Sequence, residues 1–168
     1  DIEASFEVPF VQGLRLMDTV EKQDTFKLEQ SFRDFLENIQ NPDKLEIDVP
    51  ASLQPILRDY QVQGFKWLKT LAQYSFGGIL ADDMGLGKTL QSIAYIVSEL
   101  SDIRDKQQPV LIVCPSSLTY NWLSEMRKFA PELQVRIMDG NKLERQSKLK
   151  QANDLEVIIT SYPLLRQD

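Results

Sequence analysis

The sequence predicts an α/β fold with a parallel sheet, and three observations support this prediction. Short apolar runs alternate with amphipathic stretches from residue 60 onward, an order typical of parallel strands joined by crossover helices. A glycine-rich loop stands where one of these runs gives way to a helix. The chain has 168 residues, 42% of them hydrophobic, which is enough to form a domain core of ordinary size.

The first third of the chain predicts a small, mostly helical segment. Alternating apolar residues in 6–10 indicate a short edge strand, and apolar positions at helical spacing in 24–40 predict an amphipathic helix. The stretch 50–55 begins and ends with proline, which is typical of a linker. We therefore divide the chain into an accessory segment, residues 1–51, and an α/β unit, residues 52–168.

Within the α/β unit, helices and strands are expected in alternation. Apolar side chains on one helical face predict four helices: 60–74, 88–100, 118–129 and 141–152. Apolar or alternating runs of strand length predict four strands: 77–81, 110–114, 133–137 and 157–160. In open sheets of this kind, ligands bind beyond the carboxyl ends of the strands. The loops that follow the strands are therefore the places to look for a site.

Composition excludes several classes of function. The chain has no histidine and a single cysteine, Cys114, so histidine-based zinc sites, Ser-His-Asp catalysis and an internal disulfide are excluded. Cys114 ends an apolar run, and we expect a buried, inert thiol rather than a reactive one. No apolar run approaches the ~20 residues needed to cross a bilayer, and the first residues do not resemble a secretory signal. These features predict a soluble, intracellular protein with no membrane partner.

The charge balance limits how the chain could bind nucleic acid. Its formal net charge is −6, which argues against binding through a general positive field. Contacts with nucleic acid must therefore be local. Backbone amides, hydroxyl groups and a few cations can make such contacts with phosphates at short range.

The loop Asp82–Thr89, with the sequence DDMGLGKT, has the composition of a phosphate-binding loop. Glycines are needed where phosphate oxygens crowd the main chain or where φ is positive. Amide groups at the start of the following helix, together with its dipole, favour a polyanion. We expect Lys88 to contact the β and γ phosphates and Thr89 to offer its hydroxyl to Mg²⁺. These two are the predicted catalytic residues, and Thr89 is the predicted metal ligand.

Seven loop residues form the predicted nucleotide-binding set: Asp83, Met84, Gly85, Leu86, Gly87, Lys88 and Thr89. Asp82 departs from the strict pattern, which has glycine at this position. The alternative interpretation is a glycine-rich turn in an α/β domain that precedes Lys-Thr by chance. The expected strand before the loop and the expected helix after it favour phosphate binding.

The loop resembles the D-E-M-G-L-G-K-T loop of the SWI/SNF-type ATPases of helicase superfamily two. Asp82 is the usual residue in that family, and Asp83 replaces a glutamate. Residues 57–68 are similar to the family's L-R-P-Y-Q-x-x-G-x-x-W-L segment, with aspartate in place of proline. Downstream, residues 114–122 and 160–162 resemble its P-x-S-L-x-x-N-W and T-S-Y motifs. The four motifs occur in the family's order.

This resemblance implies the first recA-like lobe of a P-loop motor ATPase that uses ATP and Mg²⁺. Gln61 would read the adenine, because a side-chain amide can both donate to and accept from a purine edge. Four hydroxyl residues that follow predicted strands would contact the DNA backbone: Ser116, Ser117, Thr160 and Ser161. The alternative is that these four residues only cap helices.

The resemblance also implies partners and a location. The parent protein would be a double-stranded-DNA-dependent ATPase or translocase that remodels DNA-bound protein complexes. Residues 1–51 loosely resemble the end of an extra domain that precedes the motor in bacterial members. We therefore expect a bacterial, cytoplasmic protein associated with the nucleoid.

Several parts of a complete ATPase are not visible in the sequence. After Lys88, no apolar strand ends in Asp-Glu, the acidic Walker B motif that would hold Mg²⁺ together with Thr89. We expect an incomplete lobe that binds nucleotide, is inactive as a hydrolase alone, and self-associates through exposed strand edges. The alternatives are a non-catalytic P-loop-like module for protein interaction or nucleic-acid docking, and an RNA-directed member of the same superfamily.

Overall fold

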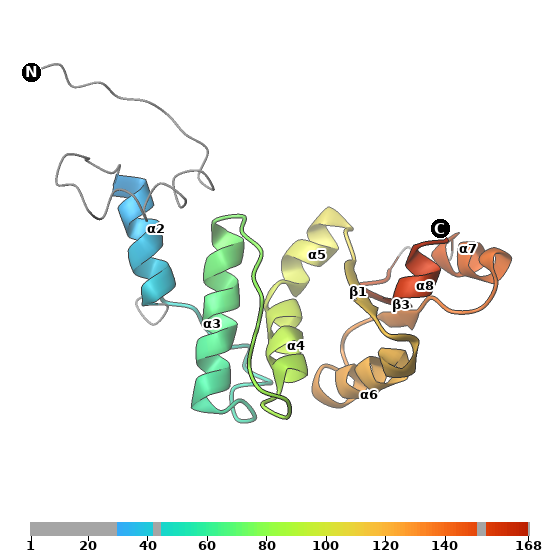
Figure 1. Cartoon of the computed structure of the whole chain (residues 1–168), viewed down its shortest axis with the longest axis horizontal. Helices are drawn as coiled ribbons and strands as arrows, with labels where there is room; N and C mark the ends of the chain where they lie inside the picture. Colours follow the sequence, from blue (N-terminus) through green and yellow to red (C-terminus); the bar gives the residue numbers. More distant parts are fainter. Residues whose placement is uncertain (1–29, 42–44, 151–153, 168) are drawn as a thin grey trace, which may run out of the picture.

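The computed structural model describes residues 30–41, 45–150 and 154–167. A parallel sheet with its covering helices lies at one end of the molecule, and a row of helices extends away from it (Figure 1). None of the helices in these described ranges is long and apolar enough to cross a bilayer.

The N-terminal segment is represented by one helix, α2 (Gln30–Gln40). This helix is the described part of the predicted helix at 24–40, whereas the predicted edge strand at 6–10 lies outside the described residues. The side-chain amide of Asn38 donates a hydrogen bond of 3.0 Å to the hydroxyl of Tyr74, just beyond the end of α3. This bond connects α2 to the C-terminal end of α3, and Figure 1 shows α2 beside the upper part of that helix.

Three of the predicted strands form a parallel sheet in the order β1-β3-β2. They are β1 (Val110–Cys114), β2 (Val135–Ile137) and β3 (Val157–Ser161). Strand β3 is central, and its last residue, Ser161, lies opposite Cys114 of β1. The predicted α/β fold with a parallel sheet is confirmed, and the carboxyl ends of β1 and β3 lie at the same edge of the sheet.

Helices connect the strands and cover both faces of the sheet. The helices described after α2 are α3 (Asp59–Gln73), α4 (Lys88–Ser98), α5 (Leu100–Lys106), α6 (Thr119–Phe129), α7 (Lys142–Lys150) and α8 (Tyr162–Leu165), with a 3-10 helix, η2 (Ser116–Leu118), before α6. The predicted helix at 88–100 is interrupted at Glu99, whose φ and ψ are −97° and 3°. The carboxylate of Glu99 forms an ion pair with Lys69 of α3. Helix α6 lies below the strands in Figure 1, and α8 lies above them.

Two clusters of buried side chains form the core. The larger cluster lies between the sheet and helices α4 and α6, and its largest fully buried members are Ile93, Met126, Val157 and Ile159. The smaller cluster lies between α3 and α4 and includes Phe65 and Leu53, both 0% exposed. Leu53 belongs to the stretch 50–55, which the sequence indicated as a linker. This stretch instead forms a turn whose apolar side chain contributes to the core.

The predicted strand at 77–81 is wrong. The segment is extended, but within the described residues none of its backbone groups pairs with another main-chain group. It runs between α3 and α4 (Figure 1), and a Cβ on Gly78 would lie 2.4 Å from Leu71 and 2.7 Å from Trp67 of α3. The segment therefore packs on helix side chains instead of pairing with a strand, and Ile79 is left 86% exposed.

Candidate nucleotide-binding site

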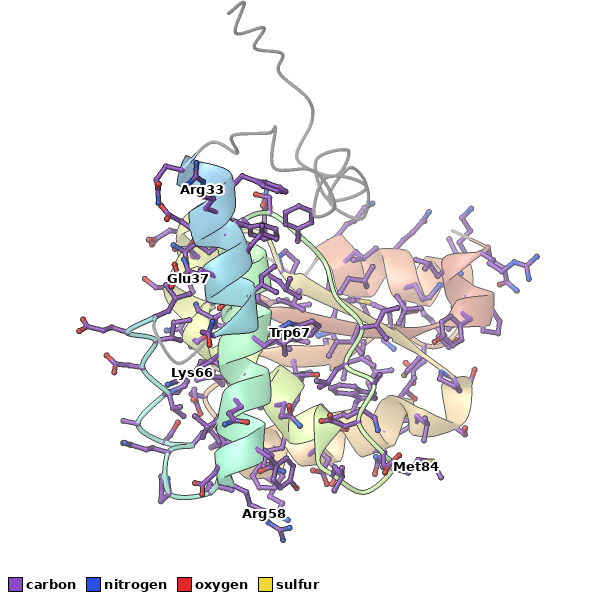
Figure 2. All side chains as sticks on the ribbon, turned by 60° about the vertical axis from the view of Figure 1, so that its left-hand side comes forward. Arg33, Glu37, Arg58, Lys66, Trp67 and Met84 are labelled. Carbon is purple, nitrogen blue, oxygen red and sulfur yellow. The ribbon has the colours of Figure 1, made fainter. Side chains whose placement is uncertain are left out.

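The predicted phosphate loop connects this extended segment to the first turn of α4. Gly85 and Gly87 have φ angles of 89° and 78°, in a region that residues with a side chain rarely occupy. Met84 lies at the tip of the loop and is 95% exposed. Figure 2 shows Met84 pointing outward, at the same end of the molecule as Arg58, which precedes α3. The loop is thus accessible to a ligand from solvent.

Main-chain N–H groups of the loop are available to an anion. In the part of the chain that the structure describes, the N–H groups of Gly85, Gly87, Lys88 and Thr89 have no main-chain acceptor. Three of these four groups lie at the beginning of α4, where the helix dipole adds partial positive charge. Unpaired amides at a helix start are the groups that bind phosphate in proteins. The loop therefore fits the phosphates of a nucleotide.

Lys88 and Thr89 open helix α4. The ammonium group of Lys88 donates hydrogen bonds to the main-chain oxygens of Asp82 and Asp83, at 2.5 and 2.9 Å. The hydroxyl of Thr89 makes no hydrogen bond to any residue in the described ranges and is half-buried. Lys88 is thus folded back over the loop, with carbonyl oxygens in the role that phosphate oxygens would have. The ammonium group of Lys88 could contact an anion once it leaves these two carbonyl oxygens.

Gln61 lies against the loop from the first turn of α3. Its side chain is 6% exposed, its Nε2 donates to the main-chain oxygen of Leu86 at 3.1 Å, and its Oε1 accepts from the N–H of Arg58 at 3.0 Å. A Cβ on Gly87 would lie 2.3 Å from this Nε2, so glycine is required there for close approach as well as for its φ angle. The structure brings Gln61 to the loop but engages both ends of its amide with protein groups.

Gln91 contacts the other end of the loop, and no sequence pattern indicated it. Its side chain is 0% exposed, and its Nε2 donates to the Oδ2 of Asp82 at 3.0 Å. Asp82 is the residue that departs from the strict phosphate-loop pattern. A single glutamine on the buried face of a helix belongs to no repeating pattern that differs from that of the apolar residues around it. The sequence therefore gave no indication of its contact with the loop.

The four predicted DNA-contacting residues lie after β1 and at the end of β3, which end at the same edge of the sheet. Ser116 and Ser117 belong to η2 and are exposed. Thr160 and Ser161 are only 6% and 3% exposed, and the Thr160 hydroxyl lies 3.5 Å from the main-chain oxygen of Met138. The sheet therefore brings all four residues to one edge but presents only the two serines of η2 to solvent.

Cys114, the last residue of β1, is buried. Burial raises the pKa of its thiol above the usual range, because a thiolate would lose its hydration. The reactive form is therefore disfavoured, which agrees with the inert thiol expected from the apolar run.

Comparison with known proteins decides the family. Residues 60–168 match the family described as the SNF2-related domain. The chain belongs to the SNF2-related family. The match begins within the first turn of α3 and includes the glycine-rich loop, the sheet and every helix after it.

Curated relatives and solved structures of this family are consistent with that assignment. The TATA-binding protein-associated factor MOT1 of Saccharomyces cerevisiae is 37% identical over 147 residues, which cover 81% of this chain and 8% of that protein. The chromatin-remodeling ATPase INO80 of Emericella nidulans is 36% identical over 144 residues, covering 78% of this chain and 9% of that protein. The Sulfolobus solfataricus SWI2/SNF2 ATPase core in complex with dsDNA has a TM-score of 0.64 and 37% identity, covering 74% of this chain and 25% of that one.

These relatives correct one expectation, leave a second without support and set a limit. The expected bacterial, cytoplasmic and nucleoid-associated location is wrong, because MOT1, INO80 and the helicase SWR1 are proteins of fungi, and two of them carry the names TATA-binding protein-associated factor and chromatin-remodeling ATPase. The expected bacterial source has no support from them either. The chain spans only 8 to 10% of the length of the first curated relatives that it matches.

Proposed function

We propose that this chain carries the ATP-binding part of a DNA-dependent ATPase that remodels protein-DNA complexes. The observation that supports this most directly is the loop Asp82–Thr89 itself, with a lysine at a helix start and four amides that have no main-chain acceptor in the described ranges. Membership of the SNF2-related family supports ATP rather than another phosphate compound as the ligand. The relatives named above support the wider activity, which would belong to a whole protein much longer than this chain.

Lys88 and Thr89 have distinct roles in this proposal. Lys88 exchanges the carbonyl oxygens of Asp82 and Asp83 for the β and γ phosphates, because a phosphate offers the ammonium a full opposite charge. Thr89, whose hydroxyl has no partner among the described residues, would hold Mg²⁺, which would neutralise charge on the phosphates when bound. The remaining loop residues, from Asp83 to Gly87, bind mainly through main-chain groups, which explains why an exposed side chain such as Met84 is compatible with the site.

The decisive experiment removes the ammonium group. Lys88→Ala should abolish binding of a fluorescent ATP analogue, because the unpaired amides alone cannot balance the triphosphate charge. Lys142→Ala, on the exposed surface at the start of α7, is the matched control and should bind as the wild type does. Nucleotide binding that survives the loss of Lys88 would favour the alternative function, a non-catalytic module with this fold used for protein interaction or nucleic-acid docking.

DNA is the proposed nucleic-acid partner, supported by the solved relative in complex with dsDNA. Ser116 and Ser117 are the proposed direct contacts, because their hydroxyls are exposed and a hydroxyl can donate to a phosphate oxygen. Thr160 and Ser161 can contact DNA only if the edge of the sheet opens, since their side chains are buried. Replacing both Ser116 and Ser117 with alanine should weaken binding of duplex DNA at low salt, and unchanged binding would count against these contacts.

Hydrolysis by this chain alone is proposed to be slow. Among the described strands, none ends in an Asp-Glu pair that could hold Mg²⁺ together with Thr89. The chain is further proposed to self-associate through backbone groups that have no partner. The segment 77–81 supplies such groups.

A further inference from the structure

We infer that Asp82 and Gln91 form a positioning pair, a side-chain hydrogen bond that fixes the start of the phosphate loop to the first turn of α4 in the geometry that binds nucleotide. The inference rests on the proposed ATP site and adds a residue, Gln91, that lies outside the loop. It also gives Asp82 a role, at the position where the strict phosphate-loop pattern has glycine.

The chemistry of the two side chains fixes the orientation of the Gln91 amide. A carboxylate can only accept hydrogen bonds, so Gln91 must turn its Nε2 toward the Oδ2 of Asp82, 3.0 Å away. The Oε1 of Gln91 then points the other way and has no hydrogen-bond partner among the residues that the structure describes, although the side chain is fully buried. A buried amide that leaves its oxygen unpaired is unfavourable by itself. This orientation of the Gln91 amide keeps the hydrogen bond to Asp82 even though it leaves the amide oxygen unpaired.

Gly64 of α3 provides the space for the unpaired oxygen. A Cβ built on Gly64 would lie 1.9 Å from the Oε1 of Gln91, so the oxygen packs directly on the glycine backbone. Any side chain at this position would push the amide away from Asp82. Helices α3 and α4 thus approach each other closely at the point where Gln91 reaches the loop.

The positioning pair matters because Lys88 cannot hold the loop and bind a nucleotide at the same time. Lys88 donates to the main-chain oxygens of Asp82 and Asp83 in this structure. When its ammonium moves to phosphate oxygens, those two bonds are lost. The bond between Asp82 and Gln91 involves neither Lys88 nor the loop amides, so it keeps the start of the loop against α4 while the site is filled.

The test first removes the hydrogen bond between Asp82 and Gln91 and then restores it with donor and acceptor exchanged. Gln91→Glu places two carboxylates in contact, which repel each other unless they share a proton. At pH 8 this variant should bind a fluorescent ATP analogue at least tenfold more weakly than the wild type, and affinity should recover as the pH is lowered. The double variant Asp82→Asn with Gln91→Glu exchanges donor and acceptor. It should bind within about threefold of the wild type and show no such pH dependence.

Two controls separate positioning from folding. Gln73→Glu, the same substitution at an exposed residue at the end of α3, should leave affinity and its pH profile unchanged. Thermal unfolding of each variant reports whether it folds. If Gln91→Glu does not fold, Asp82→Ala replaces it, because Asp82 is only half-buried and its removal leaves no buried charge. That variant should also bind about tenfold more weakly.

Three outcomes decide the matter. The inference is overturned if Gln91→Glu and Asp82→Ala bind as the wild type does, or if the double variant binds no better than Gln91→Glu. Each of these two results rejects only the positioning pair, provided that the wild type binds the analogue and Lys88→Ala does not. The proposed function is then unaffected. If the wild type itself fails to bind, the proposed function and the inference fail together.

Discussion

Two amide side chains from outside the glycine-rich loop contact its two ends, Gln61 at Leu86 and Gln91 at Asp82. The resemblance to a known family indicated Gln61, but only for contact with adenine. Its hydrogen bond to Leu86 was unforeseen, because a sequence motif records which residue is present and not what its two amide atoms contact. Gln91 was missed altogether, since a buried polar residue on an apolar helix face gives no pattern. The loop residues themselves were proposed from their pattern, because phosphate chemistry uses glycine, lysine and a hydroxyl in that order, and their binding role stays a prediction.

The role of Gln61 can be separated into loop contact and base contact. Gln61→Ala removes one donor to the loop, so binding of both ATP and GTP should weaken by about 0.5–1.5 kcal/mol, the net value of one hydrogen bond. If the amide also reads adenine, ATP should lose more than GTP, because only the adenine edge presents the matching groups. Competition titrations with the two nucleotides measure both losses. Gln63→Ala, at an exposed position of the same helix, is the control, and an unchanged ATP affinity in Gln61→Ala would exclude both roles.

Gly64→Ala tests whether close contact outweighs helix propensity. Propensity alone favours alanine in a helix by about 0.5–1 kcal/mol. A Cβ at Gly64 would lie 1.9 Å from the Oε1 of Gln91, and although that side chain is flexible, it is fully buried and bonded to Asp82. We therefore expect a net loss of about 1–3 kcal/mol in the free energy of unfolding, typical of overpacking. Chemical denaturation measures it.

Gly77→Ala is the matched substitution for this experiment. Apart from its two chain neighbours, no described residue would have a heavy atom within 4 Å of a Cβ on Gly77, so the free energy of unfolding should change little. If Gly64→Ala instead stabilises the protein, as an ordinary glycine-to-alanine change in a helix does, the close contact between α3 and Gln91 is not rigid. Packing on Gly64 would then not hold the Gln91 amide in place for the positioning pair.

At the scale of elements, three strands were predictable and one was not. The runs that became β1, β2 and β3 form one sheet, and apolar side chains of all three strands belong to the larger core cluster or pack against it. The run at 77–81 is also apolar, although it begins with two glycines, and it packs on α3 instead. Apolar periodicity reports which side chains avoid water and carries no information on which backbone groups find partners, so pairing could not be read from the sequence.

Strand β3 should contribute most to the stability of the sheet, because it pairs on both sides. Ile159 lies at its centre, is 0% exposed and belongs to the larger core cluster. Ile159→Ala should lower the free energy of unfolding by about 2–5 kcal/mol, the range for large-to-small changes in a core. Leu111→Ala, in the edge strand β1 where Leu111 is 52% exposed, should cost much less. Urea denaturation of the two variants measures the difference, and equal losses would mean that β3 is not the centre of a cooperative sheet.

For the whole molecule, the two core clusters are continuous. Val97 of α4 and Phe129 of α6 pack against both of them. The accessory and α/β units predicted at residues 1–51 and 52–168 remain a prediction, since most of the first unit lies outside the described residues. The smaller cluster already takes side chains from both sides of that boundary, because Ile47 and Val49 pack against it with Leu53. Unfolding of the described part should therefore follow a single cooperative transition.

The extended segment 77–81 leads to the last prediction, on the assembly of the molecule. Backbone groups that lack partners in an extended, exposed segment can pair with another chain, and Ile79 adds a side chain that is 86% exposed. Two copies of the segment can pair with each other, so the apparent mass should rise from that of a monomer toward that of a dimer as concentration increases. Light scattering over a dilution series measures this. Ile79→Lys should shift the equilibrium toward monomer through repulsion between like charges across the contact, whereas Leu143→Lys, at an exposed leucine of α7, should not. A monodisperse monomer of the wild-type chain at every concentration would show that the segment is satisfied by water and does not recruit a second copy.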